Sequence, residues 1–232
     1  MDENDTFLIR KVHKRSAEVQ AAEALRDGIK SGSIPLGARL TEINAAEQMG
    51  VSRATIRTAL HQLVQEGLVV QVPYTGWTVM TLSAQDAWEL YTLRASLEAL
   101  AARLVAERIR AGDTTTGTLV LSAFESLKSA CLRRVKQEIA MADLELHKAI
   151  IDLAGHRRLQ DQYSRIEHQI MIYIRSSDDL VGKPEEIVVQ HAALIDAIRR
   201  GDAEGAEKAA ATHNESEGAV LVEALKAKQS TH

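Results

Sequence analysis

Cysteine, proline and aromatic residues are scarce in this sequence. Cys131 is the single cysteine among 232 residues, so no intrachain disulfide can form and a reducing, cytoplasmic location is expected. Aromatic residues make up 3% of the chain and hydrophobic residues 45%, which favours helical cores built from Leu, Ala and Ile. Pro184 is the one proline after residue 80, which leaves long stretches free to form helices.

Long apolar runs and a strong charge of one sign are also lacking. No run approaches the roughly 18 apolar residues that cross a bilayer, and the acidic start is not followed by a secretion signal, so we expect no membrane contact. The net charge is −4, and residues 1–80 carry nine basic and nine acidic residues. Binding to nucleic acid would therefore depend on locally placed arginines and on dimerisation rather than on a broad basic field.

The most informative stretch predicts the end of one helix and the start of another. Gly50 closes the first helix, and Ser52 can accept hydrogen bonds from the free amides that begin the second. The second helix carries Arg53 and Arg57 one turn apart on one face, with Thr55 near its start. An apolar stripe follows on the other side: Ile56, Leu60, Leu63 and Val64. This pattern is typical of a DNA-recognition helix, although an ordinary amphipathic helix beginning with two arginines is the alternative.

The flanking sequence completes a winged helix. Apolar residues recur at helical spacing from Val19 to Ile29, and Thr41 can cap a short helix over residues 42–49. Two β-prone runs, 68–72 and 77–80, are separated by a predicted turn at 73–76. Three helices and a hairpin predict a winged-helix DNA-binding domain over residues 16–80, preceded by a flexible arm over residues 1–15.

The rest of the chain has a helical period throughout. Helices are expected at about 84–111, 115–129, 132–154, 157–178, 184–200 and 203–226, with glycines at most of the breaks. Short connections and no strands predict an all-α bundle over residues 83–228. The fold class is therefore mostly α: a winged helix-turn-helix followed by a six- or seven-helix bundle.

The bundle contains four candidate metal ligands. Asp143 and His147 are four residues apart and project from one helix face, while His191 and His213 lie on apolar faces of two further helices. One carboxylate and three imidazoles suit a divalent ion such as Zn²⁺, Ni²⁺ or Mn²⁺. Spacing alone leaves open that each histidine is simply a buried residue bonded to a carbonyl.

Both halves of the sequence resemble one superfamily. Leu25–Ile29, Ile34–Leu40, Gly50–Arg53 and Leu63–Leu68 resemble the GntR superfamily of winged-helix transcription regulators. Residues 143–150 and 191–213 look like the helical effector (FCD) domain of its FadR-type branch. The resemblance implies DNA contacts from Ser52, Arg53, Thr55, Arg57 and the wing glycine Gly76. It also implies that Asp143, His147, His191 and His213 hold a divalent metal in the centre of the bundle.

The chain departs from the family pattern in three places. Ile43 stands where the family has an arginine, and Ala54 replaces a more common threonine or proline, so a different operator or a weaker affinity is expected. His156 follows Ala-Gly, where the family has an asparagine, and is expected to be a loop residue outside the pocket.

Together these features predict a ligand-responsive transcription regulator. A small carboxylate effector would chelate the open positions of the metal, and Arg94 would bind a further carboxylate; a salt bridge to Glu98 is the alternative role for this arginine. A homodimer is expected to bind a near-palindromic operator in double-stranded DNA. Two alternatives remain: a metal-dependent enzyme acting on a small organic acid or ester, with the winged helix as an accessory domain, and a purely structural metal without an effector.

Overall fold

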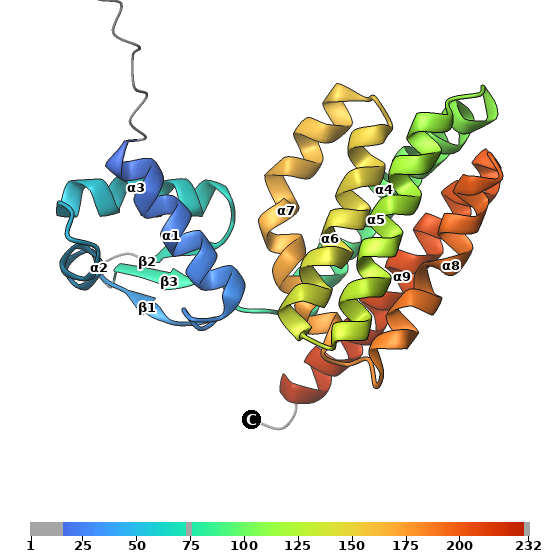
Figure 1. Ribbon diagram of the computed structural model, residues 1–232. Helices are drawn as coiled ribbons and strands as arrows, with labels where there is room; N and C mark the ends of the chain where they lie inside the picture. The colour runs from blue at the N-terminus through green and yellow to red at the C-terminus, as the bar shows by residue number, and fades with distance from the viewer. Residues whose placement is uncertain (1–15, 73–75, 230–232) are drawn as a thin grey trace, which may run out of the picture.

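The computed structural model describes residues 16–72 and 76–229. The predicted arm over residues 1–15 and the tip of the predicted hairpin, residues 73–75, lie outside the described residues. Within the described part, a small α/β unit is followed by a helical bundle, and the two are joined by a short connection (Figure 1). The mostly α fold class is confirmed.

The amino-terminal unit is a winged helix. Its helices are α1 (Ala17–Ser31), α2 (Glu42–Met49) and α3 (Arg53–Gln65), and its strands are β1 (Arg39–Leu40), β2 (Val69–Val72) and β3 (Gly76–Val79). The predicted hairpin pairs β2 with β3, and the unpredicted strand β1 adds to β3, giving the antiparallel order β1-β3-β2. This third strand joins the segment before α2 to the wing.

Local signals fix the boundaries of α2 and α3. Gly50 ends α2 in the left-handed conformation with φ 64°, which glycine adopts without steric strain. The Ser52 hydroxyl accepts a hydrogen bond of 3.1 Å from the Thr55 amide and so caps α3. The apolar face of α3 then packs inward, since Ile56, Leu60 and Leu63 are fully buried.

The helical bundle contains α4 (Ala84–Arg110), α5 (Thr114–Arg133), α6 (Lys136–Leu153), α7 (Arg157–Asp178), α8 (Pro184–Arg199) and α9 (Ala203–Gln229). Helices α4 and α9 approach each other closely at Gly218, where an added Cβ atom would lie only 2.6 Å from the Cβ of Tyr91. None of the described helices is both long and apolar enough to cross a membrane. The centre of the bundle therefore lies between elements that come from both ends of the domain sequence.

Candidate metal centre and nucleic-acid interface

The start of α3 exposes the two predicted DNA-contacting arginines. The side chains of Arg53 and Arg57 are 62% and 55% exposed, while the opposite face of the helix is buried. Both arginines are associated with Glu42 at the start of α2. Arg57 donates two hydrogen bonds to its carboxylate, at 2.8 and 2.7 Å, and Arg53 lies 3.9 Å away. The bonds from Arg57 lower the pKa of Glu42, which keeps this carboxylate charged.

The other predicted DNA contacts differ in their placement. Thr55 is buried, and its hydroxyl lies 3.0 Å from that of Ser52, which goes against a direct DNA contact from the Thr55 side chain. Gly76 begins β3 with φ 105°, a conformation that favours glycine, and a Cβ there would lie 3.3 Å from the Leu40 carbonyl oxygen. The local backbone therefore favours glycine at position 76, independently of any contact with DNA. Ile43 is half-exposed on α2.

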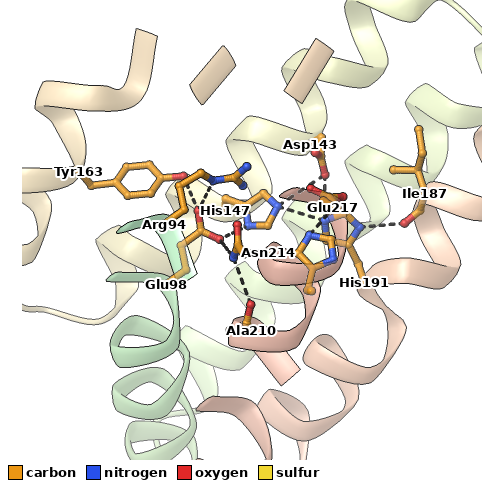
Figure 2. A network of polar contacts seen from close by, with 11 residues as sticks. Arg94, Glu98, Asp143, His147, Tyr163, Ile187, His191, Ala210, Asn214 and Glu217 are labelled. Atoms are coloured by element: carbon orange, nitrogen blue, oxygen red, sulfur yellow. Dashed lines mark hydrogen bonds and ion pairs between the residues drawn. The ribbon is translucent and has the colours of Figure 1, made fainter. Parts of the chain in front are cut away.

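The four predicted metal ligands converge in the centre of the bundle. Asp143, His147 and His191 lie together in Figure 2, and the ring centroid of His213 is 5.2 Å from that of His147 and 4.2 Å from that of His191. Asp143 and His147 come from α6, His191 from α8 and His213 from α9, and all four side chains are buried. One ring nitrogen from each histidine lies within 4.8 Å of the others. Asp143 Oδ1 lies 2.9 Å from His191 Nε2 and 3.8 Å from His147 Nε2. Three helices thus bring one carboxylate and three imidazoles to a single point.

The outward partners of two histidines determine which ring nitrogens face this point. His191 Nδ1 lies 2.8 Å from the Ile187 carbonyl oxygen, and His147 Nδ1 lies 2.8 Å from Glu98 Oε2. Since both partners are acceptors, each Nδ1 is the protonated nitrogen, and the two Nε2 atoms face each other at 3.2 Å. Two nitrogens that bind one zinc ion, each at about 2.0–2.1 Å, would lie about 3 Å apart.

Two of the atoms that could bind a metal here have no hydrogen-bond partner among the described residues. Asp143 Oδ2 and His213 Nε2 are buried without a hydrogen-bond partner, while the buried Asp143 Oδ1 lies 2.9 Å from His191 Nε2. Burying such groups unsatisfied costs about 1–3 kcal/mol each. The residues therefore fit a divalent cation, which would satisfy these atoms together. Without one, burial disfavours charge on His191, but the Asp143 carboxylate outweighs burial and raises its pKa to about 9.

Glu98 on α4 is the centre of a buried hydrogen-bond network beside the histidines. Its Oε1 accepts from Arg94 Nε and from the Tyr163 hydroxyl, each at 3.0 Å. Its Oε2 accepts from Asn214 Nδ2 at 2.7 Å and from His147. Burial opposes the charge of Glu98, yet Arg94 outweighs it and holds the pKa well below its usual range. Glu98 therefore remains ionised and links α4, α6, α7 and α9.

Arg94 makes the salt bridge to Glu98 and still has free donors. Its side chain is fully buried, and its guanidinium lies 4.9 Å above the ring of Tyr91. Neither of its terminal nitrogens has a hydrogen-bond partner among the described residues. A buried guanidinium with two unpaired amino groups is suited to a bidentate anion.

The sequence analysis missed several polar residues around the site. Glu217 Oε1 lies 3.5 Å from His213 Nε2, and their spacing of four residues on α9 is a signal that could have identified it. Asp178, near the end of α7, has a buried oxygen without a partner, and burial together with Asp143 raises its pKa to about 9. Tyr163 and Asn214 carry no spacing signal, because their partner Glu98 is distant in sequence.

The remaining histidines that were considered lie away from the metal ligands. His156 precedes α7, where its Nδ1 accepts a hydrogen bond of 3.2 Å from the Leu159 amide. It acts there as a helix cap. His168 is partly exposed and lies 3.9 Å from Glu66 of the winged helix.

A cavity of about 600 Å³ leads to the histidines from the side of α8 and α9. His213 and Glu217 form part of its wall, and Lys208, Thr212 and Ser177 add polar groups. Its size is within the range of small-molecule sites. The winged helix and this buried polar site define a DNA-binding regulator with a sensor domain.

Comparison with known protein families agrees with that class. Residues 17–79 match the model of the bacterial regulatory proteins of the gntR family, and residues 89–216 match the FCD domain. The chain belongs to the gntR family of regulators and carries an FCD domain. This confirms the predicted transcription regulator and goes against the alternative of a metal-dependent enzyme.

Individual relatives cover most of the chain. It is 27% identical over 205 residues to a probable D-xylose utilization operon transcriptional repressor of Paenarthrobacter nicotinovorans, covering 86% of this chain and 88% of the relative. It is 29% identical to a putative L-lactate dehydrogenase operon regulatory protein of Escherichia coli, covering 84% and 82%. A crystal structure of a putative GntR regulator from Rhodococcus is similar with a TM-score of 0.76 and 25% identity, covering 90% of this chain and 99% of the other.

Proposed function

We propose that this regulator holds a divalent metal ion through Asp143, His147, His191 and His213. The observation that carries this proposal is the convergence of buried side chains from these residues, in which Asp143 Oδ2 and His213 Nε2 have no hydrogen-bond partner. The Nδ1 contacts of His147 and His191 support it, because they leave both Nε2 lone pairs free for a cation. The ligand types suit Zn²⁺, Ni²⁺ or Mn²⁺.

A small carboxylate is the proposed effector. When bound, the metal supplies a Lewis-acidic centre with open positions that a carboxylate or α-hydroxy acid can chelate. Arg94 supplies the second recognition element, because its two terminal nitrogens are buried and unpaired. The cavity lined by His213 and Glu217 provides the route of entry. Relatives named for the control of xylose and lactate operons are consistent with an effector of metabolite size.

DNA binding is proposed to use the exposed start of α3 in a homodimer. Arg53 and Arg57 would contact base edges or phosphates in the major groove, Ser52 and its capped amides the backbone, and Gly76 the region of the wing. A dimer would place two such helices in successive major grooves of a near-palindromic operator. Two recognition helices binding together would compensate for the lack of a broad positive charge on a chain with net charge −4.

Zinc titration followed by L-lactate titration tests the effector site. Zinc is expected to raise the melting temperature of chelator-treated protein, and L-lactate, with its α-hydroxy group, to raise it further and to change affinity for DNA upstream of the protein's own gene. Acetate, which lacks the hydroxyl, serves as the weaker probe. Absence of any zinc effect on melting would overturn the metal site. A zinc effect without a response to either acid would favour the purely structural metal.

An Arg94→Lys variant distinguishes a role of Arg94 in effector binding from a role in the stability of the fold. Lysine keeps the positive charge beside Glu98 but cannot form the bidentate contact, so zinc should still bind while the lactate response falls about tenfold or more. Arg103→Lys on the same helix is the matched control, since Arg103 pairs with Glu207 on the partly exposed side. An unchanged lactate response in Arg94→Lys would remove Arg94 from the effector site.

A further inference from the structure

Helix α7 contacts both the buried polar network and the winged helix. It is the bundle helix drawn beside the winged helix in Figure 1, and it packs against α1. On its bundle side, the Tyr163 hydroxyl donates to Glu98. Gln169 and Arg175, one and a half and three turns further along, reach the winged helix. One rigid element thus spans the distance between the proposed effector site and the DNA-binding unit.

The two side chains from α7 bind the carboxyl ends of winged-helix helices. Gln169 Nε2 donates 3.0 Å to the carbonyl oxygen of Glu66, the residue that ends α3. Arg175 donates to the carbonyl oxygen of Lys30 in the last turn of α1. Terminal carbonyls lack partners within their own helix, so α7 supplies caps that the winged helix does not provide for itself.

The backbone around both caps leaves room for these side chains. Gly67 and Gly32, which follow α3 and α1, have φ values of 68° and 83°. A Cβ atom at Gly67 would lie 2.1 Å from Gln169 Nε2, and one at Gly32 would lie 3.1 Å from an Arg175 nitrogen. Gln169 in particular requires a residue without a side chain at position 67.

The carboxylate of Glu66 ties the capped end of α3 to α1. Arg26 of α1 donates two hydrogen bonds to it, at 2.7 and 2.6 Å, and His168 of α7 lies 3.9 Å away. A displacement of α7 at this point therefore acts on α1 and on the recognition helix together.

At the other end, Tyr163 and Arg94 share one oxygen of Glu98. Both donate to Oε1 at 3.0 Å. An anion that attracts the guanidinium of Arg94 would weaken its hydrogen bond to Glu98 and so alter the hydrogen bond between Tyr163 and Glu98. The position of α7 would change with it. We infer that α7 transmits occupancy of the buried site to the recognition helix by capping α1 and α3, a form of regulation that rests on the proposed metal and effector site.

Hydrogen exchange measured by mass spectrometry tests the caps directly. The double variant Gln169→Ala, Arg175→Met removes both caps, and the Arg158→Met, Gln162→Ala variant is the matched control at exposed positions of the same helix. In metal-free protein, we expect the amides of Glu66, Gly67 and Leu68, which bond to the last turn of α3, to exchange about tenfold faster in the cap variant alone. Equal exchange in both variants would overturn the inference.

Zinc alone is the probe for transmission, because the proposed ligand His147 contacts Glu98 and so connects a bound ion to the hydrogen bond between Glu98 and Tyr163. In the wild-type protein, zinc should slow exchange in α6 and α8 and also at the end of α3; in the cap variant, it should slow exchange in the bundle only. Tyr163→Phe keeps the caps and should reduce the zinc effect at α3. Zinc protection confined to the bundle of the wild-type protein would refute the coupling but leave the metal site standing. No zinc protection anywhere would refute the proposed metal site, and the coupling with it.

Discussion

The His147 ring and the Glu98 carboxylate lie 2.8 Å apart, with Nδ1 of the ring facing Oε2 of the carboxylate. This contact fixes the ring orientation and the tautomer, because an ionised carboxylate accepts the Nδ1 proton and leaves Nε2 free to bind a cation. Glu98 is not one of the proposed ligands, so it acts through His147 as a positioning residue.

The Glu98→Gln variant should bind zinc about 10–100-fold more weakly than the wild-type protein. The amide is neutral and offers one acceptor oxygen, so His147 loses its charged partner while the size of the side chain is retained. Competition with a chromophoric chelator measures the affinity. Glu89→Gln, at an exposed position of α4, is the control; equal zinc affinities in these two variants would show that Glu98 has no positioning role.

Replacing Arg53 and Arg57 together by alanine should lower operator affinity by about 100-fold or more, because the proposed guanidinium contacts to bases or phosphates would supply binding energy that the balanced charge of residues 1–80 does not. Fluorescence anisotropy with DNA upstream of the protein's own gene gives the affinity. Zinc content should not change. A control with Arg158→Ala and Arg165→Ala removes two exposed arginines of α7 and should bind DNA as the wild type does.

The Glu42→Gln variant should bind unrelated DNA several-fold more tightly. Arg57 loses its carboxylate partner and becomes available to phosphates, while a negative charge is removed from the DNA-facing surface. The salt dependence of log affinity should steepen by about one unit of slope per recognition helix if Arg57 then contacts a phosphate. Glu47→Gln, on the exposed side of α2, should leave the slope unchanged. A slope equal to that of the wild type in Glu42→Gln would contradict this role of Glu42.

The Asp178→Asn variant should stabilise the metal-free protein at pH 8 by about 1–2 kcal/mol. Burial first, and then Asp143, raise the pKa of Asp178 to about 9, well above its value in an unfolded chain. Its contribution to stability is therefore complete below about pH 4 and is lost as the pH rises toward 9. The two proteins should unfold alike at pH 4 and diverge as the pH increases, which thermal unfolding at a series of pH values will measure. A constant difference at all pH values would contradict the shift.

The winged helix could be predicted because its signals are local. Gly50 and Ser52 mark helix ends within a few residues, and the buried stripe of α3 repeats at helical spacing. Strand β1 was missed because two residues, Arg39 and Leu40, pair with β3 from a distance and leave no alternating pattern. The burial of Thr55 was missed as well, because its place in the first turn of α3 suggested exposure, whereas its side chain is buried and its hydroxyl contacts that of Ser52.

The clustering of Asp143 with His147, His191 and His213 could be predicted from the sequence, whereas the residues that surround them could not. Asp143 and His147 share a turn of one helix, whereas Glu98 and Asn214 meet across 116 residues of sequence, and no spacing rule connects them. The contact of α7 with the winged helix has the same origin: Gln169 and Glu66 are 103 residues apart. Side-chain polarity predicts that such groups need partners, but only the packing of helices determines which partners they find.

The close contact between α4 and α9 at Gly218 has a consequence for protein synthesis. Helix α9 is synthesised after the winged helix and after α4, and it supplies the proposed metal ligand His213 and part of the packing against α4. An unfinished chain would therefore carry a complete winged helix joined to a helical bundle that lacks α9. Its α4 would lack the packing against α9 and would be open to proteases. We therefore expect incomplete copies to be degraded before they bind operators, because such copies could not respond to an effector.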